Sequence, residues 1–288
     1  SWDSVILQGP HLYVATPLYK TPNRTMLHNQ DWSLTDLEAL AVDAVPATSF
    51  KMRGEPGRYA AAYTSWTVNH AACSARDFYR VAWRRMAGNK NERTLIAAII
   101  PPGSAHVDGV FAAGAPGREA SVVPLIAGLA SSMLLDFVTR VAPKGDIRAP
   151  QFEQLPYIAD QRFRSQIVLR ALRLNCVTDA YARLWEQCFD GAFLADSWAW
   201  EDTQRHRLGS VSAAWDPSTP LRGSAIRRRA QIEIDALVAL SLGVTAEELC
   251  TIYRTQFPVL YGYDQNSRFY DASGRLVPTA VVATWRKK

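Results

Sequence analysis

The sequence has few of the residues on which metal centres and disulfide frameworks depend. Only four of its 288 residues are cysteines and five are histidines, and no two cysteines form a C-x-x-C pair. The cysteines lie far apart along the chain, at Cys73, Cys176, Cys188 and Cys250. Structural zinc needs clustered thiolates or imidazoles, so this spacing predicts no metal site. We expect reduced thiols that pack as small apolar side chains, as in cytosolic proteins.

Long uninterrupted apolar runs are also missing. The longest apolar stretch, Val122–Val138, is interrupted by Ser131, Ser132 and Asp136. A transmembrane helix needs about 20 consecutive apolar residues, so this stretch is too short and too polar to cross a bilayer. The sequence shows no signal peptide, and we expect a cytoplasmic protein with no membrane partner. Because it opens at Ser1 without a methionine, we also expect a fragment of a longer protein.

Local catalytic motifs are absent as well. The sequence contains no G-x-x-x-x-G-K-[ST] phosphate loop, no H-E-x-x-H and no G-x-S-x-G. The histidines are scattered, and no nucleophile lies beside an evident general base. We therefore expect this chain to be non-catalytic by itself, and an independent hydrolase is disfavoured.

The composition is that of a folded protein with a mildly basic surface. Hydrophobic residues make up 48% of the chain and charged residues 20%, which excludes the disordered class. The formal net charge is +5 and the isoelectric point about 9.1. This excess suits a polyanionic partner such as nucleic acid, although charge alone does not identify one.

Two apolar, β-prone runs enclose a cationic segment. We predict strands at Phe78–Trp83 and Thr94–Ile100, joined by a loop rich in Arg, Lys and Asn whose side chains suit phosphate and base-edge contacts. We predict further strands within Arg58–Val68 and Val107–Ala112. Small amide side chains such as Asn89 tolerate the left-handed backbone of a turn.

Helical periodicity dominates the second half of the chain. We predict helices over Asp31–Leu40, Val122–Val141 and Ala225–Leu242, and a mostly helical pattern from residue 160 onward. Thr245 and Glu248 have the spacing of a capping box at a further helix start. The fold class expected is α+β, with a mixed α/β recognition domain containing a small sheet (1–158) and a mainly helical C-terminal domain (159–288).

The candidate DNA-binding residues are cations and amides of the predicted loops. Lys and Arg contact phosphates, and Asn or Gln amides pair with adenine edges. The candidates are Arg80, Arg84, Arg85, Asn89, Lys90, Arg93, Lys144, Arg148, Gln151, Lys20 and Asn23. The competing interpretation is a solvated surface in which arginine stems cover apolar groups. The run Arg227–Arg229 is either solvated or faces phosphate.

Four sequence blocks, in this order, resemble one protein family. They read QGPHLYVATPLYKTPN, YRVAWRRMAGNKNERTLIAAIIPPG, LIAGLASSMLLDFVTRVAPKGDIRAPQFEQLPYI and QIEIDALVALSLGVTAEELCTIYRTQFPVLYGYDQNSRFYDASGRLV. They are similar to the C-terminal target-recognition region of adenine-specific (N6) DNA methyltransferases of the type IIG and phage-defence kinds, the latter from the DISARM and phage-growth-limitation systems. Most of the chain is covered.

The resemblance implies that catalysis and DNA recognition belong to different regions of a bacterial restriction-modification or phage-defence enzyme. A Rossmann-like domain N-terminal to this chain would bind S-adenosylmethionine and methylate a flipped adenine, so this chain itself needs no cofactor. The present region would recognise the sequence of double-stranded DNA and contact that methyltransferase domain. In agreement, the chain has no Gly-rich cofactor turn, and its single Pro-Pro pair, Pro101-Pro102, lacks the polar and aromatic neighbours of the methylation loop.

A second hypothesis stays open beside DNA recognition. The chain is then a protein-interaction or scaffold module that docks the catalytic domain or a partner subunit, while DNA is held mainly elsewhere. Lys20 and Asn23 are compatible with both, because they suit either DNA or the missing domain.

Overall fold

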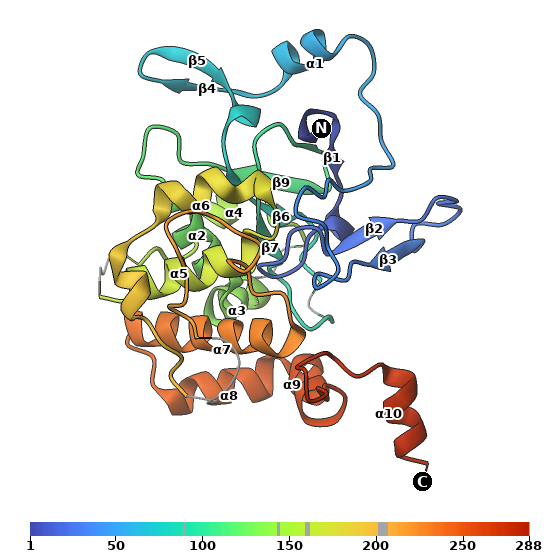
Figure 1. The fold of residues 1–288 in the computed structure, drawn as a ribbon, viewed down its shortest axis with the longest axis vertical. Helices are drawn as coiled ribbons and strands as arrows, with labels where there is room; N and C mark the ends of the chain where they lie inside the picture. The colour runs from blue at the N-terminus through green and yellow to red at the C-terminus, as the bar shows by residue number, and fades with distance from the viewer. Residues whose placement is uncertain (89, 143–144, 159–161, 201–206, 288) are drawn as a thin grey trace.

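The chain folds as an α+β protein in which a small sheet packs against a group of helices (Figure 1). The computed structural model describes residues 1–288 apart from 89, 143–144, 159–161, 201–206 and 288. Within these residues every strand lies before residue 114, and the second half contributes helices. The predicted fold class is confirmed.

The central sheet has three antiparallel strands in the order β7-β6-β9. These are β6 (Arg80–Arg84), β7 (Ala97–Ile100) and β9 (Val110–Ala113). Because side chains alternate along a strand, Val81 and Trp83 enter the main hydrophobic core while Ala82 enters a smaller core on the other face. The predicted strands on either side of the cationic loop therefore pair directly.

Three two-stranded sheets surround the central one. β1 (Ile6–Leu7) pairs with β8 (Ala105–His106), β2 (Lys20–Pro22) with β3 (Trp32–Leu34), and β4 (Ser65–Val68) with β5 (Ala71–Ser74). The β2–β3 and β4–β5 hairpins project from the body (Figure 1). Asn69 and His70 both have positive φ, which gives the β4–β5 turn the twist that tight hairpins favour.

In the N-terminal half one prediction was wrong and another was correct only in part. Asp31–Leu40 is not a helix, because Trp32–Leu34 pairs with β2 and this cross-strand pairing outweighs the weak helical pattern. In Arg58–Val68 only the last four residues form a strand. The first part lies in α1 (Pro56–Ala62), where Pro56 at the first turn and a run of alanines favour a helix.

The helices that follow form the core and the C-terminal layer. They are α2 (Val122–Ser131), α3 (Met133–Val141), α4 (Ala149–Glu153), α5 (Arg164–Asn175), α6 (Ala182–Cys188), α7 (Ser224–Ser241), α8 (Ala246–Gln256), α9 (Pro258–Asn266) and α10 (Thr279–Trp285). Short 3-10 helices occur at Trp2–Ser4, Gly9–His11, Ala75–Asp77, Asp179–Tyr181 and Gly191–Ala195.

The predicted helix over Val122–Val141 is two helices. α2 and α3 meet at an angle of 64°, and Ser132 between them has extended backbone and caps the amide of Leu135. Within the described residues no single helix is long and apolar enough to span a membrane, and only this bent pair reaches that length and apolarity together.

The predictions for α7 and for the start of α8 are confirmed. α7 matches the predicted segment to within one residue at each end. Thr245 Oγ1 accepts a hydrogen bond from the Glu248 amide, and Glu248 Oε2 accepts one from the Thr245 amide. This reciprocal pair satisfies donors that a helix start leaves free.

One main hydrophobic core runs through both halves of the chain. It joins Trp83 from the sheet, Leu125 from α2, Leu172 from α5 and Ile234 from α7. Gly128 allows α2 and α5 to approach closely, since a Cβ there would lie 2.6 Å from Ile167. The last strand ends at Ala113 and helices follow from Val122, so the change to helical structure precedes residue 158, and one core spans both sides of that residue.

The buried His11 joins the N-terminal segment to Ala47 by a hydrogen bond and makes the free energy of unfolding depend on pH. Its Nδ1 accepts from the Gln8 amide at 2.9 Å, and its Nε2 donates to the Ala47 carbonyl at 2.8 Å. Burial lowers the pKa of His11 below its usual 6.5. Above pH 6.5 the imidazole is neutral whether the chain is folded or not. Below it, the unfolded chain takes up a proton first, so acid favours unfolding.

We expect the free energy of unfolding to fall as the pH drops from about 7 to 5. The substitution His11→Gln keeps a donor and an acceptor but cannot titrate, so it should reduce this fall. Urea unfolding of both proteins across the range measures the difference. His106, whose pKa burial also lowers, remains in both proteins and cancels from the comparison. Identical pH profiles would contradict the assignment to His11.

Candidate nucleic-acid interface

The two cationic loops predicted from separate parts of the sequence lie side by side. Met86 and Asp146 form an antiparallel bridge. The Ala87 amide donates to the Gly145 carbonyl at 2.9 Å, and the Ile147 amide donates to the Arg85 carbonyl at 2.7 Å. We call residues 85–92 together with 145–151 the loop pair. Segments about sixty positions apart thus share one edge of the fold, beyond the end of β6.

Trp83 fastens the loop pair to the sheet. Its indole Nε1 donates to the Ile147 carbonyl at 2.8 Å. Its ring stacks on Phe152 of α4, with ring centres 3.9 Å apart and planes 8° apart. The side chain is 1% exposed, so the loop after residue 144 is held by both a hydrogen bond and an aromatic stack.

The loop pair presents a small set of accessible polar groups. Lys90 is exposed, and among the described residues it has no carboxylate within ion-pair distance. The Arg148 side chain is 60% exposed, with one nitrogen 3.5 Å from Asp146. Gln151 Oε1 accepts from the Arg148 amide at 3.1 Å, which fixes the start of α4. A shallow hollow is lined by Gly145, Asp146, Arg148 and Gln151.

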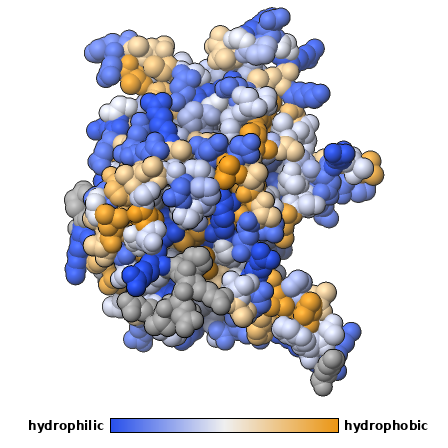
Figure 2. All heavy atoms as spheres, in the orientation of Figure 1, coloured by the Kyte–Doolittle hydropathy of each residue, from blue (hydrophilic) through white to orange (hydrophobic). Residues whose placement is uncertain are grey.

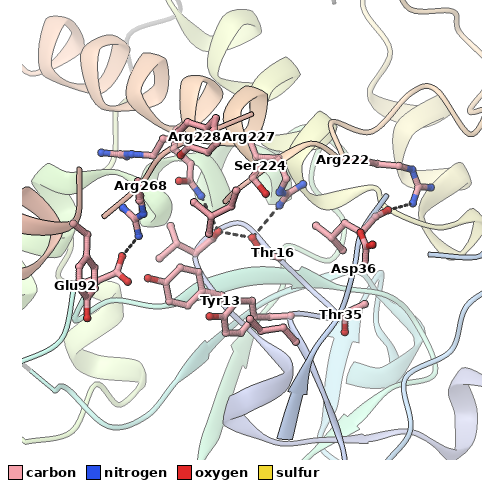
Figure 3. A pocket seen from close by; sticks show the side chains of 18 of the residues that line it. Tyr13, Thr16, Thr35, Asp36, Glu92, Arg222, Ser224, Arg227, Arg228 and Arg268 are labelled. Atoms are coloured by element: carbon pink, nitrogen blue, oxygen red, sulfur yellow. Dashed lines mark hydrogen bonds and ion pairs between the residues drawn. The ribbon is translucent and has the colours of Figure 1, made fainter. Parts of the chain in front are cut away.

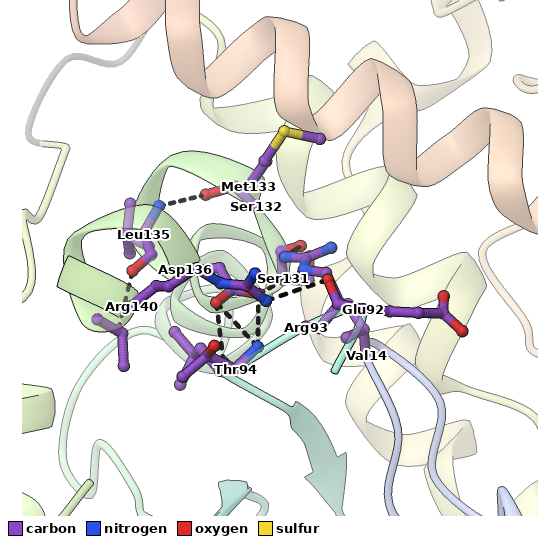
Figure 4. Close-up of polar contacts among 12 residues, drawn as sticks. Val14, Glu92, Arg93, Thr94, Ser131, Ser132, Met133, Leu135, Asp136 and Arg140 are labelled. Atoms are coloured by element: carbon purple, nitrogen blue, oxygen red, sulfur yellow. Dashed lines mark hydrogen bonds and ion pairs between the residues drawn. The ribbon is translucent and has the colours of Figure 1, made fainter. Parts of the chain in front are cut away.

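Arg80 and Arg93, which were predicted as DNA contacts, are buried in this structure and do not belong to this surface. Arg80 is 1% exposed and donates to the hydroxyl and carbonyl of Ser104. Arg93 is 4% exposed and pairs with Asp136, whose carboxylate also accepts from the amides of Thr94 and Leu95 (Figure 4). Both guanidinium groups stabilise the interior.

The guanidinium groups of Arg84 and Arg85 also bind other groups of the protein. The Arg84 guanidinium donates to the carbonyls of Gly9 and Leu12, which joins the N-terminal segment to β6. Arg85 pairs with Asp146 at 3.0 Å and with Asp108. The carboxylates of Asp108 and Asp146 offset the positive charge of Arg85, which the sequence analysis had assigned to phosphate binding.

The remaining candidates are placed elsewhere or not at all. Lys20 and Asn23 belong to the β2–β3 hairpin, where Asn23 Oδ1 accepts from the Ser33 hydroxyl at 2.6 Å and the Lys20 ammonium lies over Tyr19. Asn89 and Lys144 lie outside the described residues. Of the eleven candidates, Lys90, Arg148 and Gln151 therefore form the described part of the interface.

No protein-family model, curated protein or solved structure matches this chain. The family resemblance therefore stands on the four sequence blocks alone. In the part of the chain that the structure describes, no three metal-ligating side chains gather closely enough to hold an ion, and all four cysteines are free.

Proposed function

We propose that this chain binds double-stranded DNA as the sequence-recognition region of an adenine-specific DNA methyltransferase from a restriction-modification or phage-defence system. The observation that carries the proposal is the pairing of residues 85–87 with 145–147 by hydrogen bonds, because exposed Lys90 and Arg148 belong to the two segments that are joined in this way. In this proposal, S-adenosylmethionine and the methyl transfer belong to a separate methyltransferase domain of the parent protein.

The chemistry of the loop pair suits the backbone of a duplex. Exposed Lys and Arg side chains neutralise phosphates and release counterions. The amide of Gln151, next to Arg148, is of the type that pairs with an adenine edge. Trp83 and the β-type hydrogen bonds hold the two loops in a fixed relation, which lowers the entropy lost when DNA binds.

We expect the double substitution Lys90→Glu with Arg148→Glu to weaken duplex binding at least tenfold at about 50 mM salt. The slope of log affinity against log salt concentration should also fall by about two, because two phosphate contacts are lost. Fluorescence anisotropy with a labelled duplex of about 20 base pairs measures both quantities.

The control is Arg183→Glu, compared with the single substitution Arg148→Glu, which changes net charge by the same amount. Arg183 is an exposed arginine on α6, near Tyr79 and therefore beside the opposite end of β6 from the loop pair. It changes net charge without touching the proposed interface, so it should have a much smaller effect. Equal losses from Arg183→Glu and Arg148→Glu would show that binding follows net charge rather than this surface.

The interaction-module hypothesis is supported by a different part of the molecule. α10 extends away from the body and buries only Val282. Trp285 is 57% exposed and Leu276 is 47% exposed, and Figure 2 shows hydrophobic residues gathered there. Apolar surface of this kind suits a protein partner. If the unchanged chain bound no duplex at low salt, this function would replace DNA recognition, and full binding by the double variant would exclude the loop pair as the DNA surface.

A further inference from the structure

A cleft of about 590 Å³ lies between the N-terminal segment and the C-terminal helices. Figure 3 shows Arg227, Arg228 and Ser224 of α7 on one side of it and Tyr13 and Thr35 on the other. This volume is within the range of small-molecule sites, which is roughly 300–1,000 Å³. The cleft contains none of Lys90, Arg148 and Gln151, although Glu92, at the end of the loop pair, lies in its wall.

Two of the arginines that line the cleft have no carboxylate partner among the described residues. Arg227 donates to the carbonyls of Leu174, Leu221 and Ala15 and to the Thr16 hydroxyl. Arg222 donates to the carbonyls of residues 37, 40 and 177. The carbonyls orient both guanidinium groups but do not cancel their charges.

The other charged groups of the cleft are largely balanced in pairs. Arg93 pairs with Asp136, Arg228 with Asp264, Arg268 with Glu92, and Arg275 with Glu38. Asp36 accepts from the Glu38 amide and has no ion pair among the described residues. One carboxylate thus faces two unpaired arginines, which leaves a positive excess.

Tyrosines from both the N-terminal segment and the C-terminal part line the cleft. Tyr13 and Tyr19 stack with ring centres 4.6 Å apart, and Tyr263 and Tyr270 line the cleft from the C-terminal side. Aromatic side chains in a partly enclosed site accept planar rings by stacking. The same cleft therefore offers surfaces for a ring and for an anion.

We propose that this cleft binds a nucleoside phosphate, with the phosphate near Arg222 and Arg227 and the base against the tyrosines. The terminal nitrogens of both guanidinium groups already donate to groups of the protein, so these arginines would attract the phosphate by their charge rather than through a free fork of donors. This inference goes beyond duplex recognition and does not depend on it.

The electrostatics of Arg227 agree with an anionic ligand. Burial, and then the neighbouring charge of Arg222, lower the pKa of Arg227 to about 9. A buried cation without a counterion is costly, and a phosphate beside it would relieve both the desolvation and the repulsion.

The test uses Ser224, an exposed residue at the first turn of α7 that lines the cleft. Ser224→Asp adds a carboxylate beside the arginines, and an acidic residue at a helix start favours folding. We expect AMP and inorganic phosphate to bind at least tenfold more weakly, as measured by isothermal titration calorimetry. The matched Ser224→Asn adds no charge and should bind like the unchanged chain.

The base is tested separately with Tyr19→Leu. We expect AMP to bind about tenfold more weakly to this variant, while inorganic phosphate binds unchanged. Tyr59→Leu, on α1 and outside the cleft, is the control. Absence of AMP binding to the unchanged chain at about 1 mM, or equal binding to both Ser224 variants, would overturn the site. Equal affinity for AMP and phosphate would overturn the nucleoside assignment.

The two proposals fail independently. Ser224→Asp should leave duplex binding by the loop pair unchanged, and the Lys90 and Arg148 double substitution should leave AMP binding unchanged. Loss of both activities in either variant would overturn the separation of the cleft from the DNA interface.

Discussion

Replacing Asp136 with asparagine is expected to lower the free energy of unfolding by about 3–5 kcal/mol. Asp136 is fully buried and its carboxylate holds the Arg93 guanidinium and two backbone amides. The amide side chain of asparagine has almost the same shape, but it leaves the charge of Arg93 unpaired in the interior. Urea unfolding followed by circular dichroism gives the change.

A surface ion pair provides the comparison for Asp136. Asp108 pairs with Arg85, but its side chain is 84% exposed. Asp108→Asn should therefore change the free energy of unfolding by only about 0–1 kcal/mol. Adding Arg93→Met to Asp136→Asn removes the unpaired charge while the asparagine oxygen can still accept from a backbone amide, so this double variant should recover much of the loss. The explanation by an unpaired buried charge fails if the double variant is no more stable than Asp136→Asn.

Trp83→Ala is expected to cost about 3–5 kcal/mol of stability and to weaken duplex binding as well. The indole fills the core at the end of β6, stacks on Phe152 and donates to the Ile147 carbonyl. Its loss leaves a cavity and releases the loop that carries Arg148. Unfolding in urea and anisotropy titration with duplex, at a temperature where the variant stays folded, report the two effects.

Trp83→Phe separates packing from anchoring. Phenylalanine keeps an aromatic ring against Phe152 but has no donor for the Ile147 carbonyl, so we expect a smaller cost of about 1–3 kcal/mol. Duplex binding should fall in the order unchanged chain, Trp83→Phe, Trp83→Ala. Full duplex affinity in the folded alanine variant would show that Trp83 does not position the loop pair.

The local elements were predictable where one period dominated the sequence. The strands at β6 and β7, the helix α7 and the Thr245–Glu248 capping box follow from side-chain spacing and from backbone groups a few residues away. Asp31–Leu40 failed because its pairing partner, β2, lies in a separate segment. Ser132 bends the predicted long helix because its hydroxyl caps a new helix start.

The site was predictable only in part, because the sequence shows which side chains are cationic but not what they contact. Arg80 and Arg84 are held by carbonyl oxygens of distant loops, and Arg93 by a carboxylate 43 positions away. Of the residues that line the cleft, the sequence analysis singled out only Arg93 and arginines of the run Arg227–Arg229 as possible phosphate contacts. Nothing in that run indicated that Arg227 would be buried against carbonyls from three segments while Arg228 paired with Asp264.

The sequence by itself determined the class of fold, the order of the main elements and the positions of two basic loops, because alternation, helical period and capping are properties of neighbouring residues. Only the tertiary structure decided that these loops hydrogen-bond to each other and which arginines remain available to a ligand. The reason is that the partner of a buried charge is chosen by chain packing, which brings together groups that lie far apart in the sequence.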